Sequence, residues 1–191
     1  MKTGITIEEA LAILKKYVKT EYILAHSRES EVVMRALAKH FQEDEELWGI
    51  CGLLHDLDLD VVGPDLSNHA QKTVEILKEE GYDLPVIFRA ILCHAEKMGS
   101  IQEKRESKLE YSLSAAENIT GIIIAYTLIL PEKKLSNVQP KSVLKRLKEK
   151  SFAAKVDRVL IDDIEKTGLS KDKFVEIAVA AIKEIAPELG F

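Results

Sequence analysis

The sequence predicts an all-α fold, a single bundle of helices, and three observations support this. Proline and glycine are scarce, at five and nine of 191 residues. Apolar residues recur every three or four positions instead of alternating, which places them on one face of a helix. Two segments, Thr6 to Glu9 and Ser107 to Glu110, have the pattern of a capping box, which marks the first turn of a helix.

The first half of the chain is expected to contain five helices. The first opens at Thr6, and periodic apolar positions predict the second and the third, which ends near the segment HDLDLD. Gly81 should end the fourth helix, and Pro85 suits the first turn of the fifth. The expected ranges are about 6–19, 27–41, 44 to HDLDLD, 68–80 and 85–96.

The second half is expected to begin with a loop, the polar stretch KMGSIQEKRES. A long helix then runs from Ser107 until Pro131 halts it. Its segment ITGIIIAYTLIL is apolar nearly all round, so we expect it to be buried; residues 122–124 favour strand, but their neighbours keep helical spacing. Three further helices are expected in the Lys-rich remainder, in KSVLKRLKEK, in VDRVLIDDIEKTG and over about 170–186.

Composition predicts one globular domain over residues 1–191. Hydrophobic residues make up 46% of the chain and charged residues 31%, which excludes a disordered chain and a coiled-coil rod. The chain has 27 Lys and Arg against 32 Asp and Glu, a formal charge of −5. Nonspecific nucleic-acid binding needs a basic surface, so a nucleic-acid partner is not expected.

Membrane insertion and export are not expected either. The longest uncharged run, between Glu117 and Glu132, has 14 residues, whereas a membrane-spanning helix needs roughly 20. The start MKTGITIEEA has acidic residues where a signal peptide has a basic end and an apolar stretch. Cys51 and Cys93 form neither a CxxC pair nor a disulfide framework, and both are expected to be small buried hydrophobes. We therefore expect a cytoplasmic protein.

The histidines are the best candidates for chemistry. His55 and Asp56 are adjacent, so on a helix they point about 100° apart and do not share one core stripe. At a helix end both can reach one ion, and together they offer nitrogen and oxygen ligands that Mn, Fe, Co, Ni or Zn accept. One HD dipeptide is a weak signal by itself. His40, beside Phe41 at a predicted helix end, is expected to be a helix cap and is left out of the site.

The order of histidines and acids along this helical chain resembles the HD superfamily of metal-dependent phosphohydrolases. The segments LLHDLD, NHAQKTVEIL, FRAILCHAE and SAAENITGIIIA carry the resemblance over about residues 20–130, the expected core, and 131–191 would be a helical extension. The tail KSVLKRLKEKSFAAKVDR resembles a small bacterial and archaeal subgroup of predicted HD hydrolases. The family's usual last ligand is aspartate, whereas this chain has Glu117, whose extra methylene changes the reach.

The resemblance implies a site for one or two divalent ions, Mn, Fe, Co, Ni or Zn, with Mg as a further candidate. One ion would be held by His26, His55, Asp56 and Glu117. A second, bridged through Asp56, would involve His69 and His94, so that Asp56, His69 and His94 are the expected catalytic residues. Two such cations can lower the pKa of a bridging water and offset charge on phosphoryl oxygens. The implied activity is hydrolysis of a phosphate ester of a nucleotide or other small metabolite.

A phosphorylated substrate needs further positive charge. The expected substrate-binding residues are Arg28, Lys97, Lys104 and Arg105, the last two in the polar loop. Asp58 is a candidate to orient a ligand histidine, whereas Asp60 is expected in solvent. The basic stripe of Lys141, Lys145 and Lys148 is expected to be a solvated helix face, with contact to an anionic substrate or partner as the alternative.

Two other functions stay open at this point. The same ligand order resembles the di-iron oxygenases of this superfamily. A noncatalytic module that binds a nucleotide or a metal is the other alternative, because Glu117 replaces the usual aspartate. Substrate, metal identity and a homo-oligomeric state are not determined by the sequence.

Overall fold

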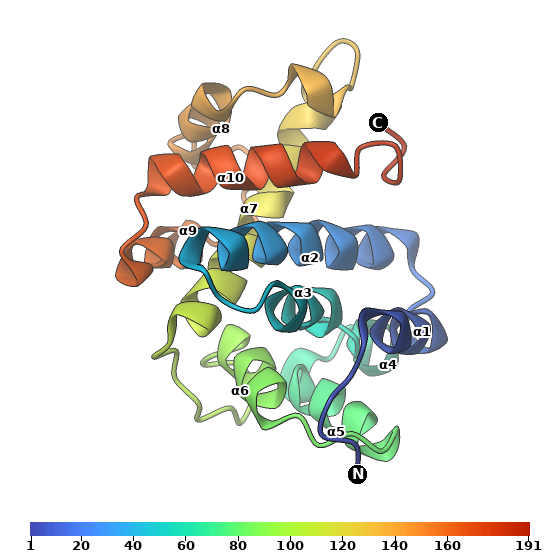
Figure 1. Cartoon of the computed structure of the whole chain (residues 1–191). Helices are drawn as coiled ribbons and strands as arrows, with labels where there is room; N and C mark the ends of the chain where they lie inside the picture. The colour runs from blue at the N-terminus through green and yellow to red at the C-terminus, as the bar shows by residue number, and fades with distance from the viewer.

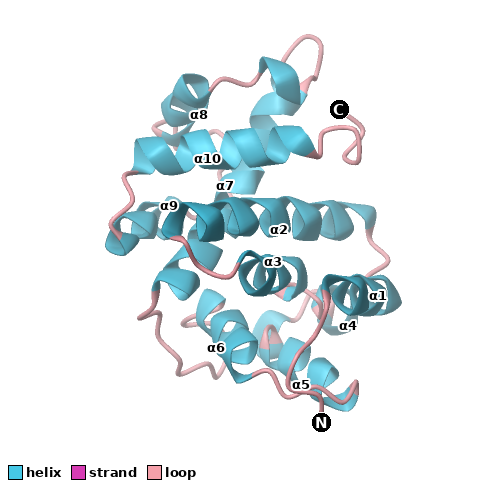
Figure 2. Ribbon diagram, in the orientation of Figure 1, coloured by secondary structure: helices cyan, strands magenta, loops and turns pink.

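The structure is a computed structural model that describes residues 1–191, and it confirms the all-α fold (Figures 1 and 2). Its only β-type pairing is an isolated bridge between Lys2 and Tyr82. The α-helices are α1 (Ile7–Tyr17), α2 (Glu21–Phe41), α3 (Glu45–Leu54), α4 (Leu59–Val62), α5 (Gln71–Glu79), α6 (Pro85–His94), α7 (Lys108–Ile129), α8 (Pro140–Leu147), α9 (Arg158–Asp162) and α10 (Lys171–Glu184). Three 3₁₀ turns complete the list: η1 (Leu66–Asn68), η2 (Leu135–Asn137) and η3 (Asp163–Thr167).

Helix α7 is the centre of the bundle. It crosses behind α2 and α10, which run side by side, and it also packs against α6, α8, α9 and η3 (Figure 1). By length and apolar content alone α7 could cross a membrane, but more than half of its apolar window is buried against these neighbours. Ile122 and Ile123 are fully buried within it, so helix is confirmed there over their strand propensity; the expected burial holds only in part, because Leu128 and Ile129 near the end of α7 are exposed.

Helices α2 and α3 share the most extensive contact between any two elements, and Gly52 permits their close approach. A Cβ atom at Gly52 would lie 2.6 Å from the carbonyl oxygen of Ser30, which is closer than a real Cβ atom comes to backbone. The two backbones therefore touch at this point. His55 lies three residues after Gly52 and His26 lies four before Ser30, so this contact brings the two histidines to the same region.

Both predicted capping boxes are present, at Thr6 with Glu9 and at Ser107 with Glu110. The prediction for the second helix was wrong at its start, because α2 begins at Glu21 and not at residue 27. A distant residue fixes the chain just before this start. The Asp60 carboxylate accepts from the backbone N–H groups of Lys19 (2.6 Å) and Thr20 (2.8 Å). Asp60 is exposed, as expected, but it also holds the two residues that precede α2.

The region before α5 also differs from the prediction. The fourth helix begins at Gln71 and not at residue 68, because Leu66–Asn68 form a 3₁₀ turn and Ala70 has a φ of +64°. His69 is therefore presented from a turn. The segment VDRVLIDDIEKTG forms the short helix α9 followed by η3 instead of one helix.

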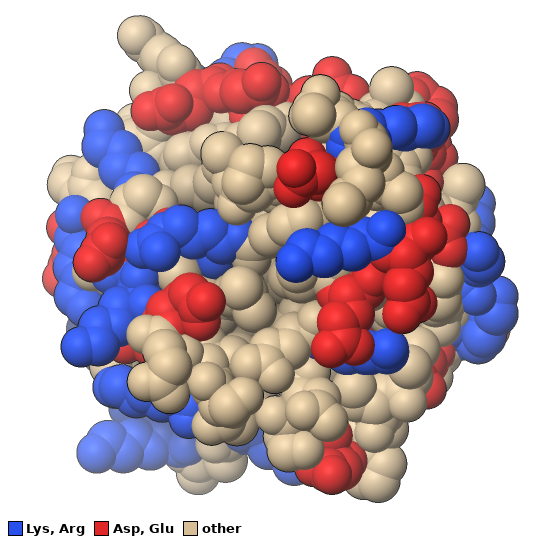
Figure 3. All heavy atoms as spheres, turned by 90° about the horizontal axis from the view of Figure 1, so that it is seen from below, with Lys and Arg blue, Asp and Glu red and all other residues tan.

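Charge is unevenly distributed over the surface. Seen from below, Lys and Arg side chains gather along one side, whereas Asp and Glu form a band across the other (Figure 3). On α8, Val143 is buried and Lys141, Lys145 and Lys148 are exposed, which is the arrangement expected of a solvated basic face.

Candidate metal centre

Six side chains from separate elements meet on the inner side of α2, next to α7. His26 belongs to α2, His55 follows the last turn of α3, and Asp56 lies in the turn after it. His69 precedes α5, His94 is the last residue of α6, and Glu117 belongs to α7. They form two groups, within each of which the ligand atoms lie within 4.8 Å of one another. The first group is His26, His55 and Glu117, and the second is Asp56, His69 and His94.

Asp56 lies between the two groups, with one carboxylate oxygen toward each. Its Oδ2 is 3.3 Å from His55 Nε2 and 3.6 Å from His26 Nε2. Its Oδ1 is 3.4 Å from His69 Nε2 and 3.6 Å from His94 Nε2. One carboxylate therefore joins two pairs of imidazoles, which is the arrangement of a ligand shared between two ions.

In the first pair, the Nδ1 atoms are already used as hydrogen-bond donors. His55 Nδ1 lies 2.8 Å from the carbonyl oxygen of Gly52, which only accepts. His26 Nδ1 lies 3.1 Å from Thr120 Oγ1, and the Thr120 hydroxyl donates to the carbonyl oxygen of Glu117 at 2.8 Å. Because the Thr120 hydroxyl has one proton and donates it to Glu117, its oxygen accepts from His26 Nδ1. Both rings therefore direct an Nε2 lone pair toward the centre when they are neutral.

The second pair is arranged in the same way. His69 Nδ1 donates to Asp58 Oδ1 at 2.9 Å, and the other oxygen of this fully buried carboxylate accepts from the backbone N–H of Ala70 at 2.8 Å. His94 Nδ1 donates to the carbonyl oxygen of Ile91. Partners of this kind set the tautomer and orientation of histidines that bind metals.

The donor set fits a cation. His26 and His55 Nε2 atoms are 3.2 Å apart, and those of His69 and His94 are 3.1 Å apart. Two neutral imidazoles of this tautomer place two lone pairs against each other, so a proton or a cation must lie between them. Imidazole nitrogens with carboxylate oxygens suit divalent ions of intermediate softness. His26, His55 and Glu117 with Asp56 would hold one ion, and His69, His94 and Asp56 a second.

The pKa values show how strongly these groups interact. Burial, reinforced by the charge of His55, lowers the pKa of His26 to about 4. Burial alone would also lower the pKa of His55, but Asp56 outweighs it and raises that pKa to about 9. Burial opposes ionisation of Asp56 too, yet the imidazoles, His55 above all, hold its pKa well below the usual value. Burial raises the pKa of Glu117 to about 8, and it lowers the pKa of His94.

The centre is reached from one side. The His26 side chain is 25% exposed, Asp56 is 12% exposed, and the other three imidazoles are at most 6% exposed. Glu117 is half-buried. Solvent therefore meets the first group, and the second group lies behind it.

None of the four expected substrate-binding side chains forms a hydrogen bond or ion pair with the side chain of a proposed ligand. Arg28 pairs with Glu31 and, at 3.1 Å, with Glu188. Lys97 and Lys104 are exposed. Arg105 is buried, and its guanidinium donates to the carbonyl oxygen of Cys93 at 3.0 Å and to that of His94 at 3.4 Å. Their roles toward substrate stay predictions.

Four contributors escaped the sequence analysis: the side chains of Thr120 and Asn118 and the carbonyl groups of Gly52 and Ile91. Asn118 donates through Nδ2 to Glu117 and accepts through Oδ1 from the backbone N–H of Asp157 at 3.1 Å. The only available signal was that Asn118 and Thr120 are polar residues in an otherwise apolar stretch, one and three positions after the candidate acid Glu117. Asp58 was a candidate to orient a ligand histidine, and it accepts a hydrogen bond from His69 Nδ1.

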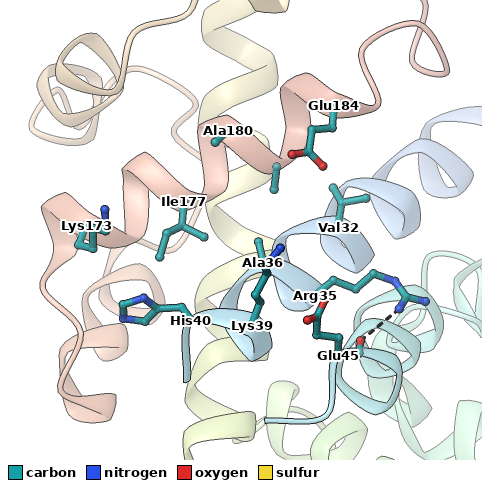
Figure 4. Close-up of a pocket in the computed structure, with 11 residues that line it drawn as sticks. Val32, Arg35, Ala36, Lys39, His40, Glu45, Lys173, Ile177, Ala180 and Glu184 are labelled. Carbon is teal, nitrogen blue, oxygen red and sulfur yellow. Dashed lines mark hydrogen bonds between the residues drawn. The ribbon is translucent and has the colours of Figure 1, made fainter. Parts of the chain in front are cut away.

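His40, Cys51 and Cys93 were left outside the site, and none of them belongs to either group of candidate ligands. His40 packs edge-on against Phe41 in the last turn of α2. It borders a hollow of about 510 Å³ between α2 and α10, whose walls also include Lys39, Ile177 and Glu184 (Figure 4). Cys51 and Cys93 are buried free thiols, and burial raises their pKa values to about 12 and about 11. They are small buried hydrophobes, as expected.

Comparison with known families agrees with this geometry. A model of the HD domain matches residues 23–137, which is more than half of the chain and includes all six clustered side chains. No curated protein and no solved structure matches the chain. The chain belongs to the HD domain family.

Proposed function

We propose that this chain is a metal-dependent phosphohydrolase that cleaves a phosphate ester of a nucleotide or another small metabolite. Members of the HD domain family are mostly metal-dependent hydrolases of phosphate esters, and membership of this family supports an enzyme of that class. The reaction type at this site, the metal and the substrate are our proposal.

The single observation that carries the proposal is the position of Asp56. Its two oxygens face two separate imidazole pairs at 3.3–3.6 Å. Divalent ions bound there would lower the pKa of a water nucleophile and offset charge on the phosphoryl oxygens. Phosphate-monoester hydrolysis requires accelerations up to about 10²¹, for which a single hydrogen bond is far too weak.

The chain's own residues have distinct tasks. Asp56 stays ionised and keeps the two imidazole pairs in register. Asp58, Thr120 and the carbonyl groups of Gly52 and Ile91 hold the rings in the tautomer that leaves Nε2 free. Since His26 and Glu117 are on the accessible side, the phosphate group approaches there.

Substrate selection is the least specified part of the proposal. Lys97 and Lys104 are exposed cations near the end of α6 and in the loop before α7, and they are our candidates for binding anionic groups of the substrate. Arg28 would first have to leave Glu188. We propose a cytoplasmic enzyme without a membrane partner, and no nucleic-acid partner is required.

The test is a phosphoester panel assayed with the purified protein loaded in turn with Mn, Co, Ni, Mg and Fe. We expect at least one ester to be hydrolysed, and we expect Asp56→Ala to lose both activity and metal content. Asp60→Asn is the matched control, because the Asp60 carboxylate is bound to Lys19 and Thr20, just before α2, and to none of the proposed ligands. Hydrolysis of no ester with any metal would contradict the proposal.

The same panel separates the two alternatives. If the iron-loaded protein consumed oxygen and its spectrum showed bound iron, it would be an oxygenase. Tight nucleotide binding without turnover would identify a binding module.

A further inference from the structure

The segment after the family match reaches back to the candidate metal centre. The HD match ends at residue 137, and α8, α9, η3 and α10 follow it. These elements pack on α7 and α2, the two helices that carry Glu117 and His26. Two of their polar contacts are to residues that themselves contact proposed ligands: Asn118, which is bonded to Glu117, and Arg105, which is bonded to the backbone of His94.

The first contact acts on Glu117 through Asn118. The backbone N–H of Asp157, at the start of α9, donates to Asn118 Oδ1 at 3.1 Å. An N–H group only donates, so this bond fixes which side-chain atom of Asn118 is the oxygen. Its Nδ2 must then be the atom that donates to the carbonyl oxygen of Ser114 at 3.0 Å and to Glu117 Oε1. The C-terminal segment thereby sets the direction of the hydrogen bond that holds the Glu117 carboxylate.

The second contact acts on His94 through Arg105. The Asp163 carboxylate, in η3, lies 3.8 Å from Arg105 Nε, and Glu96 lies 3.2 Å from Nη2 of the same guanidinium. Nη1 donates to the carbonyl oxygens of Cys93 and His94. Arg105 Nε is buried and makes no hydrogen bond, so its charge depends on Asp163 and Glu96 for compensation. Through these bonds Arg105 holds the C-terminal end of α6, whose last residue is His94.

We propose that residues 138–191 position ligands in both halves of the metal centre, with Asn118 and Arg105 as the positioning residues. The inference rests on the proposed metal site and adds to it that the HD core alone is an incomplete support. Glutamate has an extra rotatable bond compared with aspartate, and holding it in place removes rotamer freedom before an ion arrives. Partners of metal ligands typically change metal affinity by about 10–100-fold when they are removed.

The test uses full-length variants with matched controls. Asn118→Ala removes the donor to Glu117, and Asn137→Ala removes an exposed asparagine that donates to Glu132. Asp163→Asn removes the charge beside Arg105, and Asp162→Asn makes the same change one residue earlier. Both aspartates also pair with a lysine, Lys166 or Lys171, so the loss of that pair is matched.

Calorimetric titration with Mn²⁺ is the first readout, and His26→Ala and His69→Ala identify which binding step belongs to which group. We expect Asn118→Ala to weaken the step assigned to His26 at least about tenfold, and Asp163→Asn to weaken the step assigned to His69 similarly. Both controls should bind as the wild type does. In a Glu117→Asp background, Asn118→Ala should have less effect, because the shorter carboxylate is out of reach of Nδ2.

Amide hydrogen exchange of the metal-free proteins is the second readout. We expect faster exchange around residues 114–121 in Asn118→Ala and around 93–97 in Asp163→Asn, with neither control changed. If the wild type bound no Mn²⁺, the titrations would be repeated with Co²⁺ and Ni²⁺; if it bound none of these ions, the proposed metal site would fail, and exchange alone would decide whether residues 138–191 hold these two segments. Folded variants with wild-type Mn²⁺ affinity or exchange, or controls that weaken binding equally, would overturn it.

Discussion

Asp58 provides the sharpest single-residue perturbation of the candidate centre. Its two oxygens accept from His69 Nδ1 at 2.9 Å and from the backbone N–H of Ala70 at 2.8 Å. In Asp58→Asn, only one of the two positions can be an oxygen. The Ala70 N–H has no alternative protonation state, so the oxygen should turn to it and the new NH₂ group should face His69.

The consequence follows from the geometry of the rings. His69 must then carry its proton on Nε2, which lies 3.1 Å from His94 Nε2 and would donate to it. Both lone pairs needed by an ion in the second group are lost to one internal hydrogen bond. We expect the affinity of that site to fall by about 10–100-fold, or about 1.4–2.7 kcal/mol.

The assay is Mn²⁺ titration by calorimetry, with Asp60→Asn as the control. Asp60 accepts from Lys19 and Thr20 at the start of α2, so its replacement should lower the melting temperature without changing the second binding step. Imidazole ¹⁵N spectra of the metal-free protein should show that His69 Nδ1 loses its proton in Asp58→Asn alone. If Asp58→Asn kept both the Nδ1 proton of His69 and the affinity, this reasoning would be refuted.

Three further predictions concern stability and protons. Burial raises the pKa of Glu29 from 4.5 to about 7, so the folded state favours the neutral carboxyl; the contribution of Glu29 to folding stability is full below pH 4.5 and is lost as pH rises through 7. Chemical denaturation should show that Glu29→Gln gains about 3 kcal/mol in unfolding free energy relative to the wild type between pH 4.5 and 8, and a stability difference that does not change with pH would contradict this. Gly52→Ala should destabilise by about 1–3 kcal/mol, because its Cβ would lie 2.6 Å from Ser30 O; unchanged urea unfolding would show that α2 and α3 have room. With the pKa of His55 raised to about 9 and that of Glu117 to about 8, binding of the first ion at pH 7 should release roughly one to two protons, and a binding enthalpy independent of buffer ionisation would argue against it.

Elements whose signals are local were predictable from the sequence. The capping boxes at Thr6 and Ser107 are closed by residues three positions later, so a single pass along the chain finds both. The start of α2 was missed because the carboxylate that holds the residues before it, Asp60, comes from about 40 residues away. The clustering of the six candidate ligands was predictable because a family resemblance supplied the three-dimensional relation that spacing alone does not contain.

The supports of the site were less predictable. Thr120 and Asn118 are single polar residues in an apolar helix, and nothing nearby in the sequence indicates that they face His26 and Glu117. Arg105 lies in a polar loop, and nothing in the sequence indicated that it is buried. Glu96 and Asp163 flank its guanidinium, and Asp163 comes close only through tertiary packing. Its role toward substrate stays a prediction.

The central claim is that Asp56 is shared by two metal sites. Anomalous diffraction from crystals of the wild-type protein soaked in Mn²⁺ and recorded at the metal edge tests it most directly. We expect two peaks roughly 3.5–4 Å apart, one beside His26 and His55 and one beside His69 and His94, with the Asp56 carboxylate between them. Ordered side chains around Asp56 with no peak, or peaks bound only elsewhere on the surface, would contradict the claim.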